Sequence, residues 1–391
     1  MNDDGVYLDH AASTPMRPEA VEAMEPFLVG EFANPSGGHR AARVAKTALE
    51  EARESIAEVL GSRPDEVVFT AGGSEADNLA IKGAAHAART ADDRLDGVVT
   101  AAFEHKAVLA SADRLERAGF RVARVDAGAD GIVDLGSFVD ELDERSAVVS
   151  LMLVNNEVGT VQPLDAVVAA VRERAPHAVV HTDAVQAVPW LDVADAIAGV
   201  DLVAISAHKF GGPKGTGALV VRHGTALEPL VEGGGQERGL RSGTSNVAGA
   251  VAMAAALRAT HAARAADCAR VARLRDRLVD GLIAAVPDSF ENGDRARKVA
   301  GNAHLGFRGV ESEALLVLLD SQGVYAAAGS SCSSGAAEPS YVLAAMGMSH
   351  DDAAASVRFS LGFASTERDV DLALARVPAA VAQLRAAAAA A

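Results

Sequence analysis

The sequence has 391 residues, of which 49% are hydrophobic and 23% are charged, and its formal net charge at pH 7 is −17. This composition predicts a globular protein of two or three domains, and the excess of acidic residues argues against direct nucleic-acid binding. The acidic N-terminus lacks a signal-peptide pattern, and no apolar run is long enough to span a membrane. The two cysteines, Cys268 and Cys332, lie in different contexts, so we expect no disulfide and a cytoplasmic location.

Strand-like and helix-like patterns alternate from near the start of the chain to residue 222. Short apolar runs closed by turn residues predict buried strands at residues 66–70, 97–103, 121–125, 147–154, 178–182, 202–205 and 217–222. Helical periodicity predicts helices at residues 17–29, 39–60, 75–89, 106–118, 135–143 and 165–174. This order predicts an α/β fold with a doubly wound, mostly parallel sheet that is covered by helices on both faces.

The pattern changes after the glycine run at residues 233–235. A long alanine-rich helix is predicted at residues 247–285. Beyond it, short strands are predicted at residues 303–307 and 357–361, and helices at residues 312–320, 339–346 and 367–384. We therefore predict a large α/β domain at residues 15–260 and a smaller α+β domain at residues 261–391, which residues 1–14 complete.

Lys209 follows a predicted buried strand in the stretch DLVAISAHKFGGPKGTG, residues 201–217. Open α/β sheets bind ligands at the carboxyl ends of their strands. A partly desolvated lysine can have a lowered pKa and react with a carbonyl, such as the aldehyde of pyridoxal phosphate (PLP). Ser206 and His208 would then be available to the phosphate. The alternative interpretation is a surface lysine in a glycine-rich turn.

A second glycine-rich turn, with Gly72, Gly73 and Ser74, connects the strand at residues 66–70 to the helix that follows. The first backbone N–H groups of a helix have no partner within the helix, and the helix dipole is positive at that end, so the turn favours a phosphate. A plain tight turn has the same sequence pattern, and both interpretations stay open here.

Polar residues recur where the predicted strands end. They are Gly73, Ser74, His105, Asn155, Asp183, Gln186, Ser206, His208 and Lys209. Because the carboxyl ends of parallel strands meet at one edge of a sheet, we expect these residues to converge. An acid such as Asp183 would keep a pyridine nitrogen protonated, and the flat ring of His105 could stack on a cofactor ring.

Motifs extend in a fixed order over nearly the whole chain. They read YLDHAASTP, NPSGGH, FTAGGSEADNLAIKG, EHKAV, VNNEVGTVQP, HTDAVQA, SAHKFGGPKGTGALVVR, GGGQERGLRSGT, GSSCSSG and VRFSLG. In their order and spacing the chain resembles the PLP-dependent cysteine desulfurases of the NifS/IscS type, within the class V aminotransferase family. The resemblance implies the type I fold of PLP-dependent transferases, L-cysteine as the substrate and no metal ion.

The resemblance also implies a role for each matching residue. Lys209 binds the cofactor covalently, Asp183 pairs with the ring nitrogen, and Gln186 bonds the ring oxygen. His105 stacks on the ring and moves protons. The phosphate is bound by Gly73, Ser74, Ser206 and His208, and by Thr244 of the other subunit of a homodimer. The substrate is bound by Asn34, Asn155 and Arg358, of which the arginine pairs with its carboxylate.

Cys332 lies in a stretch of serine, glycine and alanine residues, which predicts an exposed loop. The resemblance implies that its thiolate attacks the sulfur of L-cysteine, gains a persulfide and releases L-alanine. A sulfur-acceptor protein in iron–sulfur cluster assembly or a thio-modification pathway would then take the sulfur. The alternative is an unreactive loop thiol, and Cys268, in a helical pattern, is expected to be structural.

Two other functions stay open. One is a different class V enzyme, such as a selenocysteine lyase or an aminotransferase. The other is a non-catalytic assembly protein that retains PLP, which the presence of both Lys209 and Cys332 disfavours. The chain departs from the family at His10, at Ala11 and after Gly362, where an arginine is common. Its polyalanine end leaves the sulfur acceptor undefined.

Overall fold

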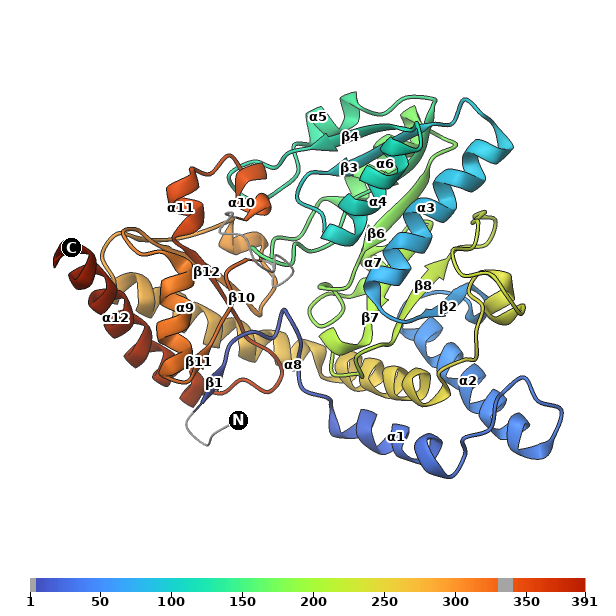
Figure 1. Ribbon diagram of the computed structural model, residues 1–391, viewed down its shortest axis with the longest axis horizontal. Helices are drawn as coiled ribbons and strands as arrows, with labels where there is room; N and C mark the ends of the chain where they lie inside the picture. The colour runs from blue at the N-terminus through green and yellow to red at the C-terminus, as the bar shows by residue number, and fades with distance from the viewer. Residues whose placement is uncertain (1–4, 330–339, 391) are drawn as a thin grey trace.

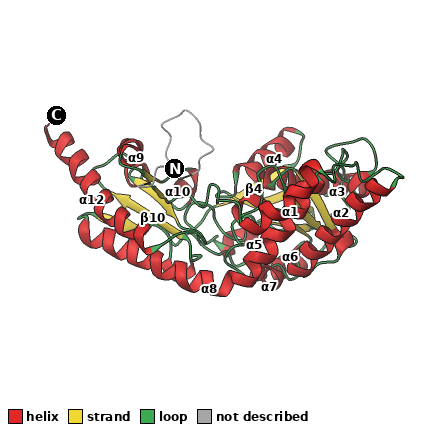
Figure 2. Cartoon of the chain, turned by 90° about the horizontal axis from the view of Figure 1, so that it is seen from below, coloured by secondary structure: helices red, strands yellow, loops and turns green. Residues whose placement is uncertain are grey.

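The structure is a computed structural model that describes residues 5–329 and 340–390. Two parts of unequal size lie side by side, and helix α8 (Val247–Ala285) runs along both of them (Figures 1 and 2). The larger part contains the seven-stranded sheet and the smaller part contains two short sheets.

The larger sheet contains all seven strands that the sequence predicts for it. Their spatial order is β2 (Val67–Thr70), β8 (Gly217–Val221), β7 (Leu202–Ser206), β6 (Val179–Asp183), β5 (Ser146–Ser150), β3 (Gly97–Ala101) and β4 (Arg121–Val125). From β7 to β4 every neighbouring pair is parallel, and β8 is antiparallel to both of its neighbours. The prediction of an α/β fold with a mostly parallel sheet is therefore confirmed.

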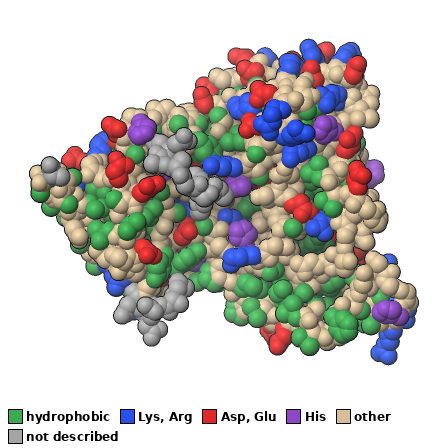
Figure 3. All heavy atoms as spheres, viewed as in Figure 1, with side chains coloured by type: hydrophobic (Ala, Val, Ile, Leu, Met, Phe, Trp, Pro, Cys, Tyr) green, Lys and Arg blue, Asp and Glu red, His purple; other side chains and the backbone are tan. Residues whose placement is uncertain are grey.

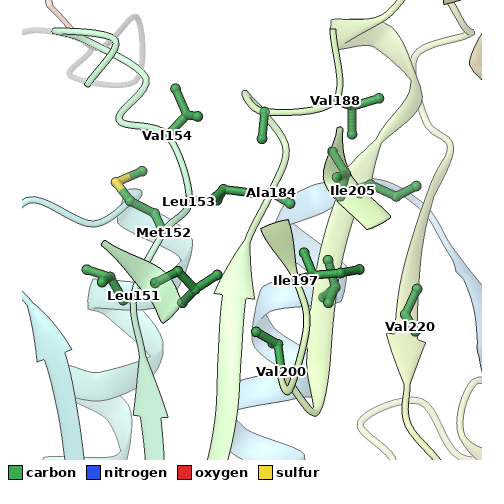
Figure 4. Close-up of a cluster of buried hydrophobic side chains, with 14 of the residues drawn as sticks. Leu151, Met152, Leu153, Val154, Ala184, Val188, Ile197, Val200, Ile205 and Val220 are labelled. Carbon is green, nitrogen blue, oxygen red and sulfur yellow. The ribbon is translucent and has the colours of Figure 1, made fainter. Parts of the chain in front are cut away.

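Helices cover both faces of this sheet, which explains why its strands are continuous apolar runs. Along β7, Val203 and Ile205 pack into one hydrophobic cluster, whereas Leu202 and Ala204 pack into another. The first cluster includes residues of α2 (Arg40–Val59), α5 (Leu135–Asp140), α6 (Leu164–Arg174) and α8, and the second includes residues of α3 (Gly73–Ala91) and α4 (Lys106–Arg117). Side chains of the first cluster fill the space around the ends of β5, β6 and β7 (Figure 4).

The smaller part is built on the antiparallel sheet β12 (Ser356–Ser360), β10 (Asn302–Phe307) and β9 (Ser289–Glu291) and on the parallel pair β1 (Val6–Tyr7) and β11 (Val324–Tyr325). Its helices are α9 (Ser312–Ser321), α10 (Tyr341–Ala345), α11 (His350–Ala354) and α12 (Glu367–Ala390). The remaining helices, α1 (Pro18–Val29) and α7 (Val193–Ala196), belong to the larger part. The sequence did not predict β1, β9, β11, α7 or α11, because two to five residues carry too little periodicity.

We propose that the chain forms two domains, residues 15–260 and residues 261–391 together with residues 1–14. The proposal rests on the way α8 packs. Along this helix no side chain is buried between Thr260 and Val271. Val271 belongs to the hydrophobic cluster that also contains Val6 and Leu8 of the N-terminal segment. The helix is continuous through this interval. Residues of α10 and α11, such as Val342 and Ala353, pack with the larger cluster.

Two element boundaries differ from the prediction in ways that affect the site. Helix α3 begins at Gly73, two residues earlier than predicted, so the glycine turn supplies the first helical N–H groups. Strand β5 ends at Ser150, and residues 151–154 continue as buried backbone outside the ladder. The chain leaves the sheet there and brings the turn at Asn155 to the sheet edge.

Helix α12 is, by length and composition, the one described helix that could cross a membrane. This is weak evidence, because Val370, Ala373 and Val377 of the same helix are buried in the hydrophobic cluster of the smaller part. The alanine-rich end of the chain continues this helix to Ala390.

Candidate active site

The carboxyl ends of the sheet strands border a cavity of about 260 Å³. It is lined by Ala11, Ala12, Gly73, Ser74, Asp77, His105, Met152, Asn156, Asp183, Val185, Gln186, Ser206, His208, Lys209 and Arg358. Arg358 comes from β12 of the smaller part, and most of the others follow strands of the larger sheet. Basic and histidine side chains are visible in the middle of the face where the two parts meet (Figure 3).

Lys209 ends a short 3₁₀ turn, Ala207–Lys209, directly after β7. Its Nζ donates hydrogen bonds to the carbonyl oxygens of Ala11 at 2.5 Å and Ala12 at 2.9 Å. These residues follow β1, so the amine contacts the segment that leads out of the smaller part. The half-buried amine therefore lies inside the cavity, where a bound carbonyl compound could reach it.

His105 is the N-cap of α4, and its Nδ1 accepts a hydrogen bond from the backbone N–H of Ala107 at 3.2 Å. Burial lowers the pKa of His105, and the positive charge of Lys209 lowers it further, whereas Asp183 opposes the shift. A neutral ring with Nδ1 as acceptor carries its proton on Nε2. The proton that His105 can move is therefore the one on Nε2.

Asp183 is the last residue of β6 and is buried. Its Oδ1 accepts the backbone N–H of Val185 at 2.9 Å. Burial raises the pKa of Asp183, while His105 and Lys209 oppose that shift. The protonated nitrogen of a pyridine ring would add a positive partner for a carboxylate in this position.

One nitrogen or oxygen atom from each of Asp77, His105 and Asp183 lies within 4.8 Å of the others. Such spacing could also hold a metal ion. The positive charge of Lys209 acts on both His105 and Asp183 and opposes a divalent metal ion at this place more strongly than a singly charged ring nitrogen. The set is better suited to the cationic ring nitrogen of an organic cofactor whose other end is anionic.

The anionic end would fit beside the N-terminus of α3, in a second cavity that adjoins the first. This cavity is lined by Ala12, Ser13, Ala71, Gly72, Gly73, Ser74, Glu75, Ser206, His208, Lys214 and Gly215. A Cβ at Gly73 would lie only 2.8 Å from Val185 Cγ2, so a larger residue would narrow the approach to the helix N–H groups. Glu75 is paired with Arg241 at 2.9 Å, which offsets its negative charge.

Arg358 is nearly fully buried in β12 and contacts both parts of the molecule. It donates to the backbone oxygen of Asn156 and to Asp9 Oδ1, both at 2.8 Å. Its Nε has no hydrogen-bond partner. A guanidinium has five N–H donors, so Arg358 retains donors for a carboxylate in the cavity while Asp9 fixes its orientation.

The side chains of Asn155 and Gln186 form hydrogen bonds with backbone groups of the protein. Asn155 Nδ2 donates to the Phe103 oxygen at 3.0 Å, and its Oδ1 accepts the N–H groups of Glu157 and Val158. Gln186 Nε2 donates to the Ala11 oxygen at 2.8 Å and lines the cavity. Their roles towards a cofactor or a substrate stay predictions.

Three of the predicted site residues that the structure describes, Asn155, Asn34 and Thr244, do not line this cavity. Asn34 is exposed between α1 and α2, where its Oδ1 accepts the N–H of Ser36 at 3.0 Å. Thr244 is exposed in the loop before α8, and its contact with a second subunit stays a prediction. Cys332 lies outside the described residues.

Sequence reasoning missed several residues of the site. They are Asp9, Asp77, Glu104, Asn156 and Lys214. Asp77 follows Gly73 by four positions on α3, and a helix places residues four apart on one face, so this spacing could have revealed it. Asp9 could not be found in this way, because its contact with Arg358 joins distant parts of the chain.

Glu104 is completely buried beneath the cavity. Its Oε1 accepts the backbone N–H of Met152 at 2.8 Å and the hydroxyl of Ser150 at 3.2 Å. Burial and the nearby Asp183 nevertheless raise the pKa of Glu104 to about 8. Glu104 is therefore mostly protonated at neutral pH.

The family model for class-V aminotransferases matches residues 6–373 of the chain. Members of this family generally depend on PLP, and the mostly parallel α/β sheet described above is the fold expected of type I PLP enzymes. The chain belongs to the class-V aminotransferase family.

Individual relatives narrow this assignment. The chain is 46% identical to an IscS-like cysteine desulfurase of Mycobacterium tuberculosis over 98% of each chain. A solved NifS-like protein aligns with a TM-score of 0.90 at 33% identity and covers 97% of this chain and 100% of its own. The solved complex of SspA with cysteine aligns with a TM-score of 0.79 at 32% identity, over 92% and 100% of the two chains. Within its family the chain is thus one of the IscS-like cysteine desulfurases.

The raised pKa of Glu104 predicts a pH-dependent stability. The folded state favours the protonated acid, so the free energy of unfolding should fall as the pH rises from about 4.5, the ordinary value, to about 8. Glu104→Gln, which mimics the protonated acid, should lack this contribution and gain stability relative to the wild type over the same interval. Urea denaturation at a series of pH values measures the difference.

The exposed Glu58→Gln on α2 is the matched control, and its difference from the wild type should not change over this interval. A stability difference between Glu104→Gln and the wild type that is independent of pH would contradict the expected protonation.

Proposed function

We propose that this chain is a cysteine desulfurase that converts L-cysteine and the thiol of Cys332 into L-alanine and a Cys332 persulfide. In this reaction the carbon–sulfur bond of the substrate breaks and a sulfur–sulfur bond forms on the enzyme. The proposal rests on one observation above all, the single cavity that is lined by Lys209, Asp183, His105 and Arg358. The membership of the IscS-like desulfurases supports it, as does the neighbouring structure that was solved with cysteine.

PLP fits this cavity as the cofactor, because the groups at one end of the cavity favour a positive charge and the groups at the other end favour a negative charge. Lys209 would bind the cofactor aldehyde, and Asp183 would hold the ring nitrogen. The N–H groups of Gly73 and Ser74, with Ser206 and His208, would hold the phosphate. When bound, PLP withdraws electrons from the substrate carbon atoms, so that a proton and then the sulfur can leave.

The residues of the chain would orient the substrate and move its protons. Arg358, held by Asp9, would bind the substrate carboxylate with its remaining N–H groups. The Nδ1 atom of His105 is bound to the backbone of α4. Its Nε2 atom would exchange a proton with the substrate in the cavity. The amine of Lys209 would be a second base in the same cavity.

Cys332 would act as the nucleophile, and its thiolate would attack the substrate sulfur. The persulfide sulfur would pass to an acceptor protein of iron–sulfur cluster assembly or a thio-modification pathway in the cytoplasm. We further propose a homodimer in which the exposed Thr244 completes the phosphate site of the partner subunit.

Lys209 should carry the cofactor. Borohydride reduction of the PLP-loaded protein should fix the pyridoxyl group on Lys209, because its amine lies inside the cavity. Peptide mapping by mass spectrometry locates the label. Lys214→Ala, at the phosphate subsite, should still be labelled on Lys209, and labelling of Lys82, Lys106 or Lys214 in the wild type would disprove the assignment.

Cys332→Ser should bind PLP as the wild type does but should form almost no alanine from L-cysteine and no persulfide. The expected loss is large because the attacking atom is removed. Chromatography of alanine and the intact mass of the protein measure the two effects. Cys268→Ser is the matched control and should keep full activity, since this thiol donates to the Trp190 oxygen at 3.2 Å. Normal alanine formation by Cys332→Ser would move the nucleophile elsewhere.

Thr244→Ala should weaken PLP binding while the protein stays dimeric. Loss of a hydrogen bond to a charged phosphate should raise the dissociation constant of PLP by about tenfold or more. Fluorescence titration and analytical ultracentrifugation measure the two properties. The exposed Thr47→Ala on α2 is the control. If the protein were a monomer that binds PLP with full affinity, Thr244 could not complete the phosphate site of a partner subunit, and the proposal would be refuted.

A further inference from the structure

A chain of buried polar side chains lies beneath Asp183, on the side of the sheet that faces α3. It runs from Glu104, after β3, through Ser150 at the end of β5 and His181 on β6, to Asp77 on α3. His181 and Asp183 are two residues apart on one strand, so both point to the same face of the sheet. The four side chains of this chain and the side chain of Asp183 are all buried.

The partners along this chain indicate the direction of its hydrogen bonds. Glu104 Oε1 accepts the Met152 N–H at 2.8 Å and is therefore the unprotonated oxygen of that group. The Ser150 hydroxyl donates to the same Oε1 at 3.2 Å. Because Ser150 has a single hydrogen, a hydroxyl that donates to Glu104 accepts from His181, whose Nδ1 lies 2.9 Å away.

This direction determines the tautomer of His181. Burial lowers the pKa of His181 to about 3, so the ring is neutral. With its hydrogen on Nδ1, the ring has a bare acceptor at Nε2. Nε2 faces Asp77 Oδ1 at 3.5 Å, and neither atom has another hydrogen-bond partner. Two bare acceptors cannot satisfy each other, but a proton on Asp77 satisfies both.

We propose that Asp77 is a neutral carboxylic acid that donates a hydrogen bond to Nε2 of His181. Asp77 and His181 are then positioning residues, and they leave Asp183 as the carboxylate that meets the cofactor ring. This consequence for the cofactor rests on the proposed function, whereas the hydrogen bond itself does not.

The charged and titratable groups around Asp77 agree with this assignment. Burial, then Asp183 from β6 and Glu104 from the end of β3, raise the pKa of Asp77 well above its usual range. His105 lies within 4.8 Å and Lys209 lines the same cavity. A second carboxylate here would favour a proton on Asp183, and Asp183 could then no longer hold a protonated ring.

Nitrogen-15 NMR of full-length protein labelled at histidine tests the hydrogen bond directly. The signal of His181 is identified by its loss in His181→Asn. We expect the tautomer with hydrogen on Nδ1 and with Nε2 as an acceptor, both with and without PLP. Hydrogen on Nε2, or a doubly protonated ring, would overturn the proposal.

Two substitutions of Asp77 separate a neutral donor from an ionised carboxylate. Asp77→Asn keeps an N–H donor and should leave the Nε2 shift, the thermal midpoint and the pH profile of PLP binding unchanged. Asp77→Ala should move the Nε2 shift towards that of an unbonded nitrogen and lower the midpoint by several degrees. A changed pH profile of PLP binding in Asp77→Asn would show that the anion is required and would also overturn the proposal.

The exposed Asp93→Asn serves as the control for the loss of a carboxyl group. If Asp77→Ala does not fold, the wild type and Asp77→Asn still decide the matter. Failure of the proposed function has a different signature, since a chain without PLP affinity would still give the tautomer of His181.

Discussion

The common direction of the central strands is the constraint on which the site depends. Strands β3, β5, β6 and β7 are parallel, so their carboxyl ends meet at one edge of the sheet. Residues that lie far apart in the sequence, such as His105, Asp183 and Lys209, thereby line one cavity. The contacts of Lys209 with the carbonyls of Ala11 and Ala12 bring the N-terminal segment against this edge.

Much of this architecture could be predicted from the sequence, because its causes are local. A strand that is buried on both faces is a short apolar run, as residues 202–205 show, and the polar residue after the run is at the sheet edge. Asp183 and Ser206 were found in this way. The glycines before Ser74 indicated a helix start that is open to a ligand, and α3 begins there.

The parts that could not be predicted depend on contacts between distant segments or on very short elements. β1 and β11 have two residues each and exist because they pair with each other. The ion pair of Arg358 with Asp9 joins two site residues that lie 349 positions apart in the sequence. His181 was within reach of sequence reasoning, since it shares a strand face with Asp183, but its link to Asp77 requires the packing of α3 on β6.

The cavity contains groups whose ionised forms are unfavourable in free energy when no ligand is bound. Burial raises the pKa of Asp183 and lowers the pKa of His208 to about 4, so each favours its neutral form in the protein alone. A ligand with a cationic ring nitrogen at Asp183 and an anionic phosphate at the start of α3 would offset both penalties. Binding then adds to the stability of the folded chain, because only the folded state holds these two subsites at the right separation. The two subsites would therefore favour a ligand with charges of opposite sign at its two ends, because such charges compensate the cost of ionising the buried groups.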